Sequence, residues 1–186
     1  MISYEQDRGY VGAAAYPKFV GGLSFSGDWK GIDLSFLFQA GLGRDVALTG
    51  VYSGGIMDNT QMTKPFYHGG NSPKYLVENS WREDNTNAEF PRLSIVQASS
   101  NNAYSSTFWY RSGDYLRLKN LQIGYTFPQK WMSRIGIDRL RIYFEGQNLW
   151  TVSELTKFNI DPEQPGVSNG YYPQQRIFSF GVNLAF

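Results

Sequence analysis

The last thirteen residues, 174–186, contain a run in which large apolar side chains occupy every second position. These positions are Phe178, Phe180, Val182, Leu184 and Phe186, with small or polar residues between them. A period of two is that of a β-strand with one apolar and one polar face. Such a strand fits the wall of a transmembrane β-barrel, with lipid on its apolar face and an aromatic residue at the interface. It also fits the last strand of a soluble β-sandwich, so this run leaves both folds open.

Four further stretches show a strand pattern, at about 19–27, 31–42, 114–127 and 139–150. The first two are separated by a tight link and predict a hairpin. In the third, the apolar positions change parity near Lys119 and Asn120. This change predicts either a β-bulge or a strand end that leaves the bilayer. With 174–186, the sequence therefore predicts about five strands.

Charged and apolar residues separate onto two faces in the stretch 139–150. Arg139, Arg141, Glu145 and Gln147 fall on one parity, and aliphatic residues with Phe144 fall on the other. This pattern is typical of a wall between lipid and a watery lumen, so we expect the four polar side chains to face the lumen. A charge on the lipid face would cost about 2–4 kcal/mol at mid-bilayer, and the expected lipid faces of 31–42, 139–150 and 174–186 carry none over their central residues.

The connections between the predicted strands alternate in length. They are short at 28–31, very long at 43–113, shorter at 128–138 and long at 151–173, with one short helix expected near 73–81. Transmembrane barrels have short periplasmic turns and longer loops outside. The alternation therefore predicts that 43–113 and 151–173 are extracellular loops and that the C-terminus is periplasmic.

Composition excludes several classes of protein. The 17 Lys and Arg nearly balance the 16 Asp and Glu, so nothing indicates a nucleic-acid partner. There is no cysteine, which excludes disulfides and thiolate metal sites. No run approaches the roughly 18 apolar residues of a membrane-spanning helix. The first residues lack a signal-peptide pattern, so we expect either a cytoplasmic protein or, as the other patterns favour, a piece of a longer one.

No catalytic site, metal site or cofactor is predicted. The single histidine, His68, has no ligand or nucleophile at a defined spacing. Glu83 and Asp84 lack the ligand spacing of a calcium loop. Asp161 and Glu163 stand beside prolines and are expected in a turn.

Aromatic residues of the long connections are the candidates for binding a substrate or partner. Their flat, amphipathic rings could stack on sugar rings or grip another protein. The alternative is packing within the loops or an interfacial girdle. The candidates are Tyr104, Trp109, Tyr110, Tyr171 and Tyr172.

Four segments resemble a known family. Residues 114–128, DYLRLKNLQIGYTFP, and 140–151, LRIYFEGQNLWT, are similar to C-terminal segments of SusC-like (RagA-type) TonB-dependent outer-membrane transporters. Residues 7–35 match an upstream pattern that includes WKGIDLS, and 87–93, NAEFPRL, matches a loop segment. The matches occur in family order over nearly the whole chain.

The resemblance implies a barrel of about 22 strands that imports oligosaccharides or peptides. It implies a SusD-like surface lipoprotein as partner, and energy from the TonB complex through an N-terminal part. The other partners are the lipid bilayer and the barrel-assembly machinery, which would recognise a C-terminal signal formed by Phe178, Phe180 and Phe186. Because five strands cannot close such a barrel, we expect a C-terminal fragment of an outer-membrane transporter that is not an enzyme.

Two alternatives stay open from the residues. A soluble carbohydrate-binding β-sandwich would bury Phe36, Phe144 and Phe180 between two packed sheets. An outer-membrane enzyme barrel would need a serine–histidine or carboxylate constellation on one side, which the isolated His68 does not provide.

Overall fold

The computed structural model describes residues 9, 14–48, 73–93, 106–164 and 174–186, and the chain divides into two compact units. The sheet unit comprises 17–42, 114–153 and 173–186, and the loop unit comprises 1–16, 43–113 and 154–172. Within the described ranges, no helix is long and apolar enough to cross a membrane.

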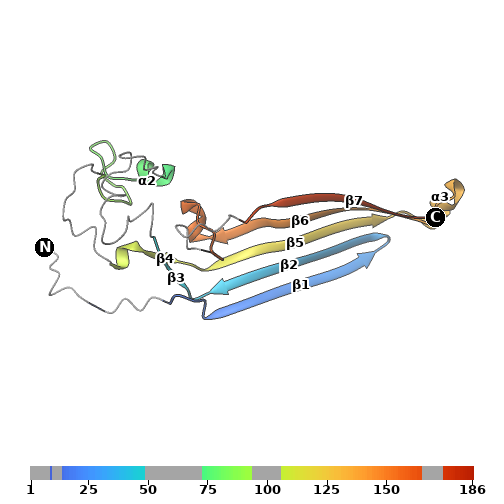
Figure 1. Ribbon diagram of the computed structural model, residues 1–186, viewed down its shortest axis with the longest axis horizontal. Helices are drawn as coiled ribbons and strands as arrows, with labels where there is room; N and C mark the ends of the chain where they lie inside the picture. The colour runs from blue at the N-terminus through green and yellow to red at the C-terminus, as the bar shows by residue number, and fades with distance from the viewer. Residues whose placement is uncertain (1–8, 10–13, 49–72, 94–105, 165–173) are drawn as a thin grey trace. The chain divides into compact units, whose positions relative to one another are not determined.

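Five long strands lie side by side in the sheet unit (Figure 1). They are β1 (Phe19–Trp29), β2 (Ile32–Leu42), β5 (Tyr115–Thr126), β6 (Arg139–Ser153) and β7 (Ile177–Ala185). Their order across the sheet is β1-β2-β5-β6-β7, and each neighbouring pair is antiparallel. The strands agree with the predicted stretches, with small differences at their ends: β6 continues to Ser153, and β7 begins at Ile177.

The strand register gathers most of the large apolar residues of the five strands on one face of the sheet. Phe36 of β2 lies opposite Phe25 of β1 and Leu121 of β5. Phe144 of β6 lies opposite Phe180 of β7. Neighbouring rings are in contact, with the Phe25 and Phe36 centroids 5.3 Å apart. No Asp, Glu, Lys or Arg of the five strands falls at these face positions.

This apolar face is largely exposed. The side chain of Phe180 is 83% exposed, and Phe186 is 85% exposed. A soluble sandwich would bury Phe180 between two sheets, so that expectation is wrong for this residue. Exposed apolar patches larger than a few hundred Å² mark surfaces that meet a membrane or another protein.

A β-bulge crosses β5 and β6. The register of β5 against both of its neighbours shifts around Leu118 and Asn120, which leaves Lys119 as an extra residue. In β6, Asn148 and Leu149 lie between the residues paired on either side of the shift, and Asn148 has a φ of 52°. The extra residue returns Leu118 to the apolar face. The bulge predicted from the change of parity is therefore confirmed.

The short connections occur at one end of the sheet. Lys30 and Gly31 join β1 to β2 with φ angles of 51° and 88°, both positive, as a type I′ turn requires. Two short helices, α3 (Gln129–Met132) and η3 (Ser133–Ile135), join β5 to β6. The Thr126 N–H donates to the Gly31 carbonyl at 2.7 Å, which places both connections at the same end.

The loop unit has a small core of its own. Its elements are β3 (Asp45–Ala47), α2 (Lys74–Glu78), η2 (Thr107–Trp109), β4 (Tyr110–Ser112) and η4 (Glu154–Phe158). Strands β3 and β4 pair antiparallel. The buried residues are Val46, Leu48, Leu76, Phe90, Trp109, Leu155, Phe158 and Ile160. Each large apolar side chain buried in this way contributes about 1.5–3 kcal/mol, so the described parts of the long connections form a folded body.

Candidate functional site

Residues far apart in the chain meet at the edge of the loop-unit core. Helix η4 contributes Leu155 and Phe158 to the same cluster as Leu76 and Phe90. The ring of Tyr75 packs edge-on against Phe158, with centroids 5.3 Å apart. This packing brings together charged side chains from the connection 43–113 and from the segment after β6.

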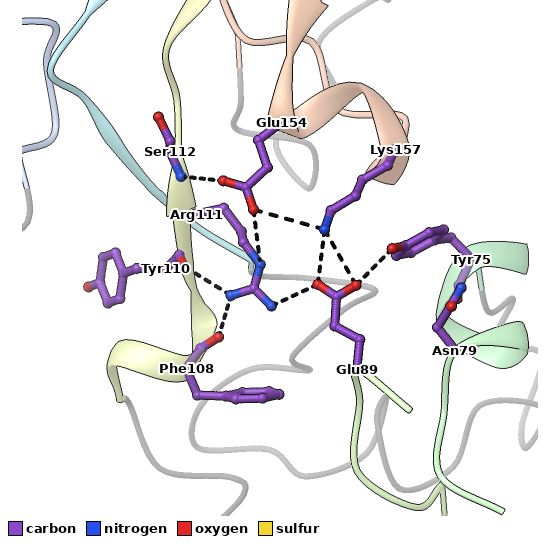
Figure 2. A network of polar contacts seen from close by, with 9 residues as sticks. All are labelled: Tyr75, Asn79, Glu89, Phe108, Tyr110, Arg111, Ser112, Glu154 and Lys157. Atoms are coloured by element: carbon purple, nitrogen blue, oxygen red, sulfur yellow. Dashed lines mark hydrogen bonds and ion pairs between the residues drawn. The ribbon is translucent and has the colours of Figure 1, made fainter. Parts of the chain in front are cut away.

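Glu89 is the centre of a polar network (Figure 2). Its Oε2 accepts a hydrogen bond of 2.7 Å from the Tyr75 hydroxyl. Its Oε1 accepts one of 3.1 Å from Nη2 of Arg111 and one of 3.2 Å from Nζ of Lys157. The carboxylate thus accepts hydrogen bonds from three donors, one each in α2, β4 and η4.

Glu154 is the second acid of the network. Its Oε2 accepts a hydrogen bond of 3.0 Å from the Ser112 N–H, and its Oε1 lies 3.7 Å from Nε of Arg111 and 3.9 Å from Nζ of Lys157 (Figure 2). Two acids and two bases therefore balance within one cluster. Such balance is needed because a desolvated charge without a partner is costly.

Arg111 is the most enclosed charge of the network, with its side chain 13% exposed. Its Nη1 donates to the backbone carbonyls of Phe108, at 2.5 Å, and Tyr110, at 2.9 Å. The guanidinium carbon lies 5.7 Å from the ring centroids of both Phe108 and Phe158. Arg111 therefore links β4, η2 and η4 through charge, hydrogen bonds and ring contacts.

The network shifts the pKa of two of its members. Burial raises the pKa of Glu89, but hydrogen bonds from Tyr75, Lys157 and Arg111 outweigh burial and hold it below its usual 4.5. The hydrogen bond to Glu89 raises the pKa of Tyr75 above its usual 10.0, and burial acts in the same direction. Both shifts favour the state in which Glu89 is ionised and Tyr75 is protonated.

We expect the loop unit to lose stability in acid. Because the folded pKa of Glu89 lies below 4.5, its contribution is complete above that pH and is lost as the pH falls through the folded pKa. The contribution of Tyr75 is lost as the pH rises through its folded pKa above 10.0. Hydrogen exchange of the α2 and η4 amides against pH measures both effects.

Glu89→Gln is the matched control for this pH dependence, because it keeps the shape of the side chain and removes its titration. The variant should be less protected at neutral pH and should show a flatter acid limb. An unchanged acid limb in the variant would show that another group is responsible.

The polar face of the sheet unit carries a paired charge between two strands that are not neighbours. Arg141 of β6 donates two hydrogen bonds to the Asp33 carboxylate of β2, from Nε at 2.9 Å and from Nη2. Gly124 of β5 lies between them in the sheet. The guanidinium of Arg141 also lies 4.8 Å from the ring centroid of Tyr143. The ion pair therefore passes over Gly124 and joins three strands.

Two other glycines of this face are covered by rings from the next strand. A Cβ at Gly181 would meet the ring of Tyr143, its partner in β6, and a Cβ at Gly41 would meet the ring of Tyr115, its partner in β5. The Tyr115 hydroxyl also accepts a hydrogen bond of 3.1 Å from Gln39. These large side chains lie along the sheet because the facing residue has no side chain.

Gly124→Ala should destabilise the sheet by about 1–3 kcal/mol. The added methyl would lie 2.5 Å from Oδ1 of Asp33 and 2.6 Å from Nη2 of Arg141, so the ion pair must separate. Gly22→Ala is the control, since its methyl would meet nothing closer than 3.5 Å. Urea titration of the two variants in the same lipid measures the difference. Equal midpoints would contradict the role assigned to Gly124.

The structure places the predicted site residues in different surroundings. Trp109 is 4% exposed and stacks on Phe90 in the loop-unit core, which corresponds to the packing alternative. Tyr110 is half-buried in β4. Arg139, Arg141, Glu145 and Gln147 lie in β6 opposite the apolar parity, and Nε2 of Gln147 donates to Glu145 at 3.2 Å. Tyr104, Tyr171, Tyr172 and His68 lie outside the described residues.

The remaining predicted residues lie at the sheet edge or in a turn. Phe178 and Phe180 occupy the apolar face of β7, and Phe186 follows its last residue. The Glu163 N–H donates to Oδ1 of Asp161 at 2.9 Å, so the turn predicted there is confirmed. Among the described residues, no group of three His, Asp or Glu could hold a metal ion.

Sequence patterns did not identify the network around Glu89. Lys157 and Glu89 are 68 residues apart, and no periodic spacing connects them. The available signal was the segment 87–93, whose resemblance to a family loop includes both Glu89 and the buried Phe90.

The chain is similar in sequence to known TonB-dependent receptors. The chain is 28% identical, over 97% of its length, to TonB-dependent receptor P3 of Formosa agariphila. It is 26% identical over its whole length to TonB-dependent receptor P39 of the same organism, and 30% identical over 55% of its length to TonB-dependent receptor SusC of Bacteroides thetaiotaomicron. The chain spans only 17%, 18% and 10% of these relatives. No family model matches it.

Solved structures agree with these relatives. The RagAB peptide importer in its open-open state matches with a TM-score of 0.60 and 25% identity, over 94% of this chain and 18% of that one. In its closed-closed state the TM-score is 0.61 and the identity is 26%, with the same coverage. The fold is therefore that of a segment of an antiparallel β-barrel, as the period-two pattern of the strands predicted. The predicted resemblance to SusC-like (RagA-type) TonB-dependent outer-membrane transporters is confirmed.

Proposed function

We propose that this chain forms part of the wall and extracellular loops of an outer-membrane importer energised through TonB. The observation that carries the proposal is the uncharged apolar face shared by all five strands of the sheet unit. In a membrane this face meets lipid, and the opposite face, with Asp33, Arg141 and Glu145, lines the lumen. The chain itself performs no catalysis.

The dimensions of the strands suit a bilayer. β1 and β2 have 11 residues each, which extend about 36 Å at roughly 3.3 Å per residue. A tilt of about 40° reduces this height to about 28 Å, close to the roughly 25 Å apolar band of an outer-membrane barrel. Aromatic side chains stand at both ends of β1, with Trp29 level with Tyr125 at one end and Phe19 at the other. They fit the two interfacial girdles.

The lengths of the connections support one orientation of the sheet in the membrane. The end with the β1–β2 turn and α3 faces the periplasm, and the end that leads to the loop unit faces outward. The C-terminus is then periplasmic, and 43–113 and 151–173 are extracellular. Phe178, Phe180 and Phe186 form the signal that the barrel-assembly machinery recognises.

The cargo is a nutrient of the oligosaccharide or peptide class, and the partners are a SusD-like surface lipoprotein and the TonB complex. Two similar proteins support this proposal: one is the TonB-dependent receptor SusC, and the other is the RagAB peptide importer. Tyr104, Trp109, Tyr110, Tyr171 and Tyr172 are the predicted loop aromatics for cargo or lid. Of these, Trp109 would act by shaping the loop, because its ring is buried.

Single cysteines test the orientation, since the chain contains none. Lys74→Cys lies on α2 of the loop unit and Lys130→Cys on α3. A membrane-impermeant maleimide should label the first in intact cells and the second only after the outer membrane is permeabilised. Labelling of both in intact cells, or recovery of the protein in the soluble fraction, would refute the proposal. Uptake that persists without TonB would refute the energy source.

A further inference from the structure

A cleft of about 440 Å³ opens on the loop unit beside α2. Val77, Trp81 and Leu93 give it apolar walls, and Arg82, Glu83 and Arg92 add charged groups. Its volume lies within the range of small-molecule sites, about 300–1,000 Å³. Trp81 keeps 37% of its surface exposed, so part of the indole is free to contact a ligand.

The backbone around the cleft is held by hydrogen bonds. The Trp81 N–H donates to the Phe90 carbonyl and the Phe90 N–H to the Asn79 carbonyl, each at 2.9 Å. The turn between the two segments is closed by the Asn85 N–H, which donates to the Arg82 carbonyl at 2.9 Å. Ser80 is buried, and its hydroxyl donates to the Leu76 carbonyl. The walls are therefore organised before any ligand binds, which lowers the cost of binding.

The charges of the cleft are not equivalent. Arg82 is already paired, with its Nε 3.1 Å from Oδ1 of Asp84, and its Nη1 donates to the Val77 carbonyl at 3.2 Å. Among the described residues, Glu83 and Arg92 have no hydrogen bond or ion pair. One cation and one anion thus remain available beside an apolar surface.

We propose that this cleft binds a small amphipathic zwitterion, namely an apolar amino acid or a short peptide with free ends. The ligand carboxylate pairs with Arg92, whose planar fork of donors matches a carboxylate. The ligand ammonium pairs with Glu83, and the apolar side chain lies against Trp81, Val77 and Leu93. A neutral sugar would satisfy neither free charge.

If the ligand is cargo, its biological role rests on the proposed import function. The binding itself does not, because it is measured on purified protein without transport. A protein that imports but does not bind in this cleft would refute this inference alone. A protein that binds here but is absent from the outer membrane would refute only the import function.

The test uses the full-length natural protein, purified in detergent. The probes are the dipeptide Leu-Leu, its N-acetyl form, its C-amide form and the neutral disaccharide maltose, titrated by calorimetry. We expect saturable binding of Leu-Leu, about tenfold weaker binding of each blocked form, and no binding of maltose. Binding of maltose, or equal binding of all three dipeptides, would overturn the proposal.

Two variants assign the charges. Arg92→Ala should weaken Leu-Leu and N-acetyl-Leu-Leu about tenfold and leave the C-amide unchanged. Glu83→Ala should weaken Leu-Leu and the C-amide and leave the N-acetyl form unchanged. Arg134→Ala removes the same charge from an exposed position of η3 and should change nothing. A loss that is the same for all probes, or no loss in either variant, would contradict the proposed contacts.

Discussion

Replacing Phe36 by arginine should prevent stable insertion of the sheet into a bilayer. Phe36 lies near the centre of β2 on the apolar face and stacks on Phe25 at 5.3 Å. An arginine at mid-bilayer on a lipid face costs about 2–4 kcal/mol, and the ring contacts with Phe25 and Phe38 are lost as well. The measurement is the folded fraction during urea titration in phospholipid vesicles, together with the amount recovered in outer membranes.

Gln122→Arg is the matched control for Phe36→Arg. Gln122 lies in the neighbouring strand at a similar height, opposite Ser35 and Glu145, and faces the polar side. The same positive charge there meets water and Glu145, so it should cost little. If both variants insert equally well, the apolar face does not meet lipid. If both fail equally, the two faces do not differ as proposed.

Glu89→Ala should open the loop unit while the sheet stays folded. The change leaves Arg111, Lys157 and the Tyr75 hydroxyl without their shared acceptor. Removing one partner of a buried ion pair costs about 3–5 kcal/mol, and the Glu89 side chain is 27% exposed, so about 2–3 kcal/mol is expected. Limited proteolysis and hydrogen exchange of α2 and η4 measure the opening.

Glu78→Ala removes the same charge from the same part of the chain. Its partner is Lys74, at 3.6 Å, and both side chains are more than half exposed, at 59% and 85%. Such an exposed pair along a helix contributes about 0.3–0.5 kcal/mol. Cleavage rates that rise equally in the two variants would show that the network around Glu89 does not hold the loop unit together.

The strands were predictable because alternation reports directly on the two faces of a sheet. Phe178, Phe180 and Phe144 lie where period two placed them, and even the bulge near Lys119 was visible as a change of parity. A strand between lipid and water has different chemistry on each side along its whole length.

The loop unit was less predictable for a physical reason. Strands β3 and β4 have three residues each, too few for any period to show. The pairing of Arg111 and Lys157 with Glu89 depends on which segments meet in three dimensions, and local sequence does not encode this. Trp109 illustrates the consequence, since composition alone could not separate a binding surface from a core residue.

The glycines of the polar face carry information that alternation lacks. Alternation distinguishes odd from even displacements of one strand along another, but a slip of two residues keeps every side chain on its proper face. Such a slip between β6 and β7 would place Tyr143 against Ser179 or Asn183 in place of Gly181. The same displacement between β2 and β5 would move Tyr115 off Gly41 and Gly124 away from Asp33. Size complementarity between rings and glycines on the polar face therefore selects one register. The apolar face alone does not distinguish this register from one displaced by two residues.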